Sequence, residues 1–164
     1  MPAESLRTSA CITNVTHGVI LADRAAIAHT WWRRLRGLLA RRRLHEGEGL
    51  IFPRCRSIHT AFMQFPIDVI FAKSDGQPAA DAARSVLVTK FVERLKPFRV
   101  VWDRDAETVI ELPANTISRT STQRGTRLTI THPTTSSTRT AIVPHTSNSI
   151  GTARLPSLPL FYLT

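Results

Sequence analysis

The residues best suited to chemistry gather between Cys55 and Phe71. This stretch holds a thiol (Cys55), an imidazole (His59), a thioether (Met63) and a carboxylate (Asp68) within two adjacent segments rich in strand-forming residues. A thiol beside an imidazole can form a nucleophile and base pair, and both groups are ligands for zinc. A reactive or ligand-binding site of this chain is therefore expected here.

The spacing of Cys55 and His59 argues against both a nucleophile and base pair and a shared zinc site. The two residues are four positions apart, which on an extended strand places their side chains on one face about 13 Å apart. A shared metal would need a bend in the strand and two further ligands. No zinc-like spacing occurs among the other histidines, which are His17, His29, His45, His132 and His145. We expect no catalytic residue, no metal site and no cofactor, and retain a Cys/His metal-binding or thiol-dependent protein as an alternative.

Asp68 is a carboxylate between Ile67 and Val69 in an otherwise apolar segment. Alternation along a strand places Asp68 on the opposite face from these two neighbours. A buried carboxylate needs a partner, and Arg36 or Arg41 can supply a cation. We predict that an Asp68–arginine bridge joins a helix to the sheet, and we favour this structural role over ligand binding.

Positive charge is the second functional signal. The chain has a formal net charge of +10, which favours polyanionic partners. Six arginines lie between Arg33 and Arg43, and Trp31 and Trp32 precede them. Arginines beside exposed aromatic rings can hold single-stranded nucleic acid, although charge runs are more often solvated faces. A basic nucleic-acid-associated protein using Arg33–Arg43 is therefore a second alternative.

One helix and many short strands are expected to position these residues. Thr30 can cap a helix, and the apolar face of that helix carries Trp31, Trp32, Leu35, Leu38 and Leu39. Alternating apolar residues predict a hairpin that turns at Ala22–Asp23, with strands at residues 16–22 and 24–29. Further strands are predicted at residues 49–53, 57–62, 67–73, 85–92, 98–103, 108–112 and 127–131.

Turn signals complete this pattern. Asp75–Gly76 predicts a turn after the strand at 67–73, and Pro113 can begin a short helical turn. Many short strands with turns between them are typical of a sandwich or barrel. We predict a mainly β (β-rich α+β) fold, with a jelly-roll or partly closed barrel-like sheet and one packed amphipathic helix.

The length of 164 residues indicates one domain with tails. Threonine, serine and proline make up half of the residues from Thr131 to Thr164, a composition typical of disorder. We expect a flexible N-terminus at 1–14, a single domain at 15–131 and a disordered tail at 132–164. Two cysteines and no apolar run long enough for a signal or a membrane span lead us to expect a cytoplasmic protein with reduced thiols.

Five separated blocks resemble a known family. They are Arg36-Gly-Leu-Leu-x-Arg41 with Leu44, Gly49-Leu-Ile-Phe52, Ser57-Ile-His-Thr60 continuing through Met63 and Phe65-Pro-Ile-Asp-Val-Ile-Phe71, Val109-Ile-Glu-Leu-Pro-Ala114, and Gly125-x-Arg-Leu128. In this order they look like the conserved bacterial and archaeal family called domain of unknown function 192.

The resemblance implies a β-rich fold of jelly-roll or barrel type with one helix and no established catalytic activity. In many relatives Trp-Met stands where this chain has His59 and Thr60, so the imidazole is not required by the family. Asn115 replaces a glycine of the family, and asparagine tolerates a left-handed turn.

The function expected from these observations is a non-catalytic β module that binds a small ligand or protein partner. Its expected ligand-binding residues are His59, Met63, Asp68, Arg36 and Arg41.

Overall fold

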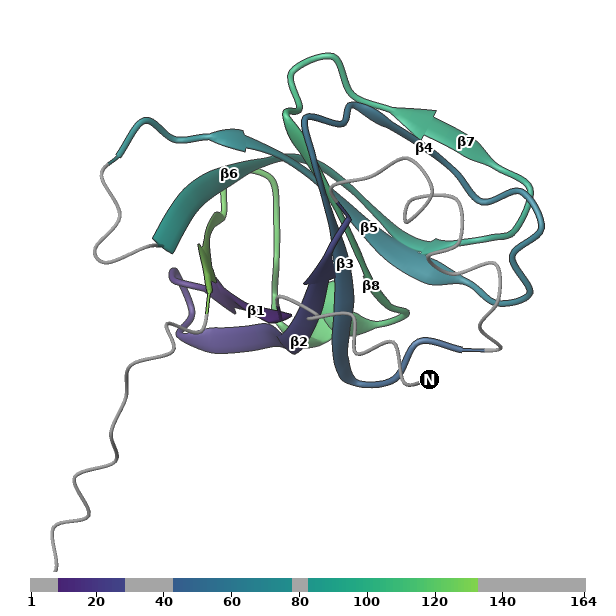
Figure 1. Cartoon of the computed structure of the whole chain (residues 1–164), viewed down its shortest axis with the longest axis horizontal. Helices are drawn as coiled ribbons and strands as arrows, with labels where there is room; N and C mark the ends of the chain where they lie inside the picture. Colours follow the sequence, from purple (N-terminus) through teal and green to yellow (C-terminus); the bar gives the residue numbers. More distant parts are fainter. Residues whose placement is uncertain (1–8, 29–42, 78–82, 133–164) are drawn as a thin grey trace, which may run out of the picture.

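The computed structural model describes residues 9–28, 43–77 and 83–132 (Figure 1). Within these ranges the chain forms nine strands and one short helix. The elements are β1 (Ser9–Asn14), β2 (Val19–Ile27), β3 (Gly47–Pro53), β4 (Ser57–His59), β5 (Ile67–Ser74), β6 (Ala83–Leu95), β7 (Val100–Trp102), β8 (Thr108–Pro113), α2 (Thr116–Arg119) and β9 (Arg127–Thr131). The prediction of a mainly β, barrel-like fold is confirmed.

Seven of the strands close into a barrel in the order β1-β2-β3-β8-β5-β6-β9. The barrel is complete because β1 pairs with β9, at Cys11 with Thr131 and at Asn14 with Leu128. All its neighbouring strands are antiparallel except β2 and β3, which run parallel. Closure leaves the barrel without an unpaired edge, which removes a site for unwanted strand pairing.

Two hydrophobic cores lie on the two faces of the barrel wall. The first contains alternate residues of the central strands, such as Ile70 of β5 and Ile110 of β8. The second contains the residues between them, such as Phe71 and Val109. We call the second cluster the outer core. Burial of both faces explains why β5 and β8 are apolar almost without interruption.

The strands β4 and β7 form a separate two-stranded ribbon. Ile58 of β4 and Val101 of β7 pack against the outer core, so one face of the ribbon covers that side of the barrel. Figure 1 shows the ribbon lying apart from the barrel's closure at β1. The other face of the ribbon is turned away from both cores.

The structure differs from the sequence-based prediction near the N-terminus. No turn occurs at Ala22–Asp23, because β2 continues through these residues and the register with β3 shifts between Ala22 and Arg24. The broken alternation marks a β-bulge, which interrupts the pattern as a turn would. The true turn follows Asn14 and includes Gly18 at φ 65°. β1 lies within the segment 1–14 that was expected to be flexible, so the barrel begins before residue 15.

One further predicted element is observed, and two others lie outside the described residues. The short helical turn expected after Pro113 is α2. The predicted helix at 30–41 and the predicted tail, apart from His132, lie outside the described residues. No described helix has the length and apolar character to cross a membrane.

Candidate functional site

Asp68 has a structural position at one end of the barrel. It is fully buried, and its two carboxylate oxygens accept backbone N–H bonds of 2.8 Å from Arg94 and Ile117. Arg94 lies in the left-handed region at φ 49°, and Ile117 lies in α2, whose N-cap Asn115 makes no side-chain cap bond. Asp68 therefore caps the helix from a distant strand and holds the irregularity near the end of β6. The predicted bridge to Arg36 or Arg41 involves residues outside the described part of the chain.

Two other predicted ligand-binding residues, His59 and Met63, do not share a site, and Arg36 and Arg41 lie outside the described residues. Met63 is only 6% exposed and belongs to the outer core. His59 is exposed on the outward face of the ribbon. The predicted cleft would require His59, Met63 and Asp68 to line one surface, but two of these side chains are buried. Of the three, His59 alone is open to a partner.

Cys55 is engaged locally rather than with His59. Its Sγ donates to the carbonyl oxygen of Ser57 at 3.1 Å, and its side chain packs against the outer core. In the part of the chain that the structure describes, no three His, Cys, Asp or Glu side chains lie close enough to hold a metal ion. The thiol is half-buried and hydrogen-bonded, which suits a structural role.

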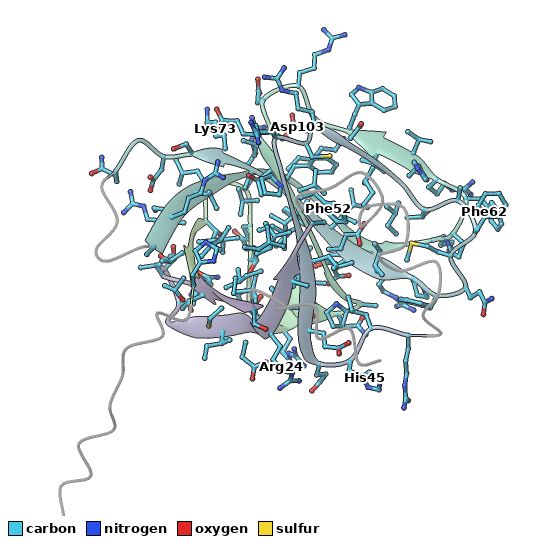
Figure 2. All side chains as sticks on the ribbon, in the orientation of Figure 1. Arg24, His45, Phe52, Phe62, Lys73 and Asp103 are labelled. Atoms are coloured by element: carbon cyan, nitrogen blue, oxygen red, sulfur yellow. The ribbon has the colours of Figure 1, made fainter. Side chains whose placement is uncertain are left out.

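The outward face of the ribbon carries large apolar side chains that nothing in the described chain covers. Val100 is 65% exposed and Trp102 is 60% exposed. At one end of the ribbon Phe62 is 71% and Phe98 66% exposed, with ring centroids 6.1 Å apart in an edge-to-face arrangement (Figure 2). His59 pairs with Val100 in register. We call these five residues the aromatic face.

Both phenylalanines sit on strained backbone. Phe62 has φ 63° and Phe98 has φ 57°, in the left-handed region that bulky side chains avoid. Such a conformation costs about 1 to 2 kcal/mol per residue and persists only where the surroundings enforce it. Arg54, Arg94, Asn115 and Ser121 also have left-handed φ values, so it is the combination of strain with two exposed rings that distinguishes this face.

Thr60 is hydrogen-bonded across both strained segments, and its carbonyl oxygen accepts the N–H of Met63, next to Phe62, at 3.3 Å. It is fully buried, and its carbonyl oxygen accepts the N–H of Phe98 at 2.9 Å. Its hydroxyl donates to the carbonyl oxygen of Lys96 at 2.8 Å and accepts the N–H of Arg99 at 2.9 Å. One threonine thus ties the loop before Phe62 to the loop around Phe98 and presents both rings together.

The ribbon and its loops are positively charged. Residues 54–64 and 94–105 contain six arginine or lysine residues and two aspartates, a net formal charge of +4. The six are Arg54, Arg56, Arg94, Lys96, Arg99 and Arg104. None of them forms a salt bridge with a carboxylate in the described ranges. Their charge is therefore available to an anion.

Glu111 is a buried carboxyl that sequence reasoning missed. It lies in β8 between Leu50 of β3 and Val69 of β5, and it is 5% exposed. Burial raises its pKa to about 8, so most of the carboxyl is protonated at neutral pH. The signal that identified Asp68, a carboxylate within an apolar strand, was also present in Val109–Leu112.

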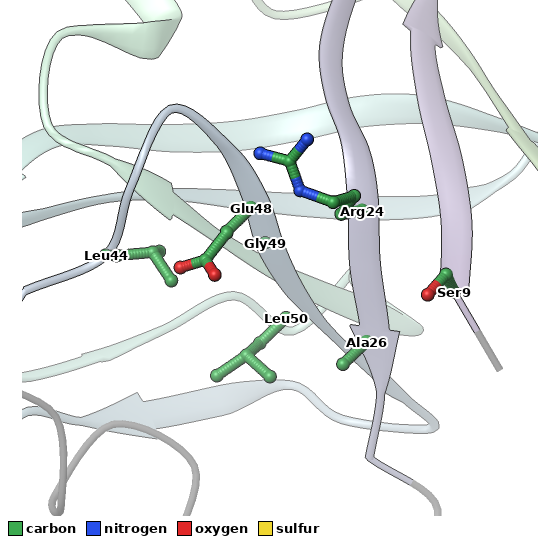
Figure 3. Close-up of a pocket in the computed structure, with 7 residues that line it drawn as sticks. All are labelled: Ser9, Arg24, Ala26, Leu44, Glu48, Gly49 and Leu50. Carbon is green, nitrogen blue, oxygen red and sulfur yellow. The ribbon is translucent and has the colours of Figure 1, made fainter. Parts of the chain in front are cut away.

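A small pocket lies beside the paired strands β2 and β3 (Figure 3). Its volume is about 220 Å³, below the range of about 300–1,000 Å³ typical of small-molecule sites. Arg24 at its margin donates to the carbonyl oxygen of Glu46, and Glu48 accepts the N–H of His45. Because these polar groups are already engaged, the pocket is a weaker candidate than the aromatic face. Its lining residues are Ser9, Arg24, Ala26, Leu44, Glu48, Gly49 and Leu50.

Comparisons with known proteins agree on the fold. The family model of DUF192, described as Uncharacterized ACR, matches residues 12–130. A putative transcription regulator from Sinorhizobium meliloti 1021 is similar at TM-score 0.57 and 23% identity, covering 73% of this chain and 89% of that one. A protein of unknown function from Novosphingobium aromaticivorans DSM 12444 matches at TM-score 0.57 and 19% identity, covering 78% and 89%. No curated protein matches. At these identities the two structures share the fold with this chain.

Proposed function

We propose that this chain, which belongs to the uncharacterised family DUF192, is a non-catalytic binding module whose contact surface is the aromatic face. The observation that carries the proposal is the pair of exposed rings, Phe62 and Phe98, held on left-handed backbone by Thr60. A fold gains no internal packing from side chains directed into water. The strain therefore has a use if those rings meet a partner.

The proposal changes the ligand-binding set expected from sequence. It keeps His59, which pairs with Val100 on the ribbon. It leaves out Met63 and Asp68, because a partner cannot reach a buried thioether or a carboxylate already occupied by two N–H groups. A binding role is also consistent with a Cys55 thiol that hydrogen-bonds to its own loop.

A capture experiment with matched variants tests the proposal. The test variant is Phe62→Ser/Phe98→Ser/Trp102→Ser, which removes the exposed rings without opening a core. The control is Val15→Ser/Ile20→Ser, because these side chains are 50% and 55% exposed in another part of the barrel. Wild type and both variants are immobilised, exposed to extract of the native cells, and their bound material is identified by mass spectrometry and nucleic-acid staining.

The expected result is material held by wild type and by the control but lost from the test variant. Circular dichroism must show that all three proteins are folded. Identical captured material on all three proteins would contradict a role for the aromatic face, and so would its absence from all three.

A further inference from the structure

We infer that the ligand of the aromatic face is single-stranded nucleic acid, an inference that rests on the proposed function. Three features of the described residues lead to this class: flat rings open to solvent, unpaired cations around them, and a rigid support beneath them. Each feature by itself fits other classes of ligand, but all three together on one surface favour single-stranded nucleic acid.

The rings offer stacking surfaces at both ends of the ribbon. Phe62 and Phe98 lie together at one end, and Trp102 closes β7 at the other end, next to Asp103 (Figure 2). Val100 lies between them with its side chain on the same outward face. Bases in a single strand present both faces for stacking, whereas bases in a duplex are covered by their neighbours. The face therefore suits a strand that crosses the ribbon from end to end.

The charge around the rings fits a phosphate backbone. Arg99 follows Phe98 directly, Lys96 lies two positions before it, and Arg104 follows the β7 end of the ribbon. These cations have no carboxylate partner in the described residues, so a polyanion meets no competing internal ion pair. Lysine and arginine beside aromatic rings are typical of single-strand binding surfaces.

The support beneath the rings lowers the cost of binding. Ile58 and Val101 anchor the ribbon to the outer core, and Thr60 fixes both loops. The rings need not be ordered when the ligand arrives, so less conformational entropy is lost. None of these residues belongs to the Arg33–Arg43 cluster, which is another group of positive charges in the sequence.

Fluorescence anisotropy with defined probes tests the ligand class. The probes are labelled oligothymidylate and oligouridylate of about 12 nucleotides, within the site sizes of single-strand binders, the corresponding duplex, and polyglutamate as an acidic polypeptide. Single alanine variants of Phe62, Phe98 and Trp102 are each expected to weaken single-strand binding between about 5-fold and 150-fold. The Val15→Ser/Ile20→Ser control should bind as wild type does.

Two further sets of variants separate stacking from charge and from misfolding. Phe62→Tyr and Phe98→Tyr keep a ring and should retain binding, whereas Phe62→Leu and Phe98→Leu keep an apolar side chain and should lose it. Lys96→Ala/Arg99→Ala should reduce the slope of log affinity against log salt concentration by about 0.7 for each phosphate contact removed. The Arg41→Ala/Arg42→Ala/Arg43→Ala variant measures what the other cluster contributes.

The outcomes distinguish this inference from the function on which it rests. Equal binding by wild type and the aromatic variants, or loss of binding only in the arginine-cluster variant, would overturn it. Failure to bind either oligonucleotide, together with face-dependent capture of nuclease-resistant material, overturns the ligand class and leaves the proposed function standing. Preference for duplex or for polyglutamate also overturns the ligand class.

Discussion

Replacing Glu111 with glutamine should change how the stability of this protein depends on pH. The carboxyl lies in β8 between apolar neighbours on both sides, and burial raises its pKa from 4.5 to about 8. The folded protein therefore holds this proton more tightly than the unfolded chain does. Since the unfolded chain releases the proton first, the free energy of unfolding falls as pH rises from 4.5 to 8 and is level above that.

The size of the effect follows from the shift in pKa. Each unit corresponds to about 1.4 kcal/mol, so the shift to about 8 lowers the wild-type free energy of unfolding by about 3 kcal/mol at pH 7 and about 5 kcal/mol at pH 9, relative to acid pH. Glutamine has nearly the shape of the protonated acid and does not titrate. Glu111→Gln should therefore match wild type near pH 4 and exceed it increasingly above pH 5.

Urea unfolding at about pH 4, 7 and 9 measures this difference directly. All other titrating groups are common to the two proteins, so they cancel when the two free energies are subtracted. Glu93→Gln serves as a control, because Glu93 is an exposed glutamate of β6. Parallel pH profiles for wild type and Glu111→Gln would refute the reasoning, since they would mean that Glu111 ionises normally.

Two further predictions concern the end of the barrel near α2. Asp68→Ala should lower the free energy of unfolding by about 2 kcal/mol or more, because it leaves the buried N–H of Ile117 and the part-buried N–H of Arg94 without acceptors. Exposed Asp105→Ala should change it by less than about 0.5 kcal/mol, and equal losses in urea unfolding of the two variants would contradict the capping role. Asn115 has φ 71°, so Asn115→Gly should be neutral or slightly stabilising while Asn115→Val should cost about 1 to 2 kcal/mol. Thermal unfolding of the pair tests this, and an equal melting temperature for the two variants would show that the left-handed conformation carries no cost.

The central strands were predictable because burial on both faces gives a continuous apolar run. The strands predicted at residues 67–73 and 108–112 correspond to β5 and β8, each of which ends one residue later than predicted. The bulge at Asp23 was not predictable as a bulge, since only pairing with β3 distinguishes it from a turn. The boundary at residue 15 was wrong for a related reason, because β1 is held by partners distant in sequence.

The candidate site was predictable only in part. The apolar neighbours of Asp68 indicated that its carboxylate needs a partner. The partners themselves are N–H groups of segments distant in sequence, which the sequence does not reveal. The aromatic face could not be predicted, because the N–H groups of Phe98 and Arg99 donate to Thr60, which lies far from them in the sequence. Glu111 could have been found by the same reasoning as Asp68. The resemblance to DUF192 placed the fold but carried no information on which surface meets a partner.

Pairing between β1 and β9 has a consequence for how the protein is made. Cys11 and Thr131 are neighbours across this seam although 120 positions separate them, so closing it requires one of the longest loops in the domain. During synthesis β1 leaves the ribosome long before β9, and until then one edge of its backbone is unpaired. The growing chain is therefore most exposed to aggregation before β9 appears, and truncation just before Arg127 should yield insoluble protein.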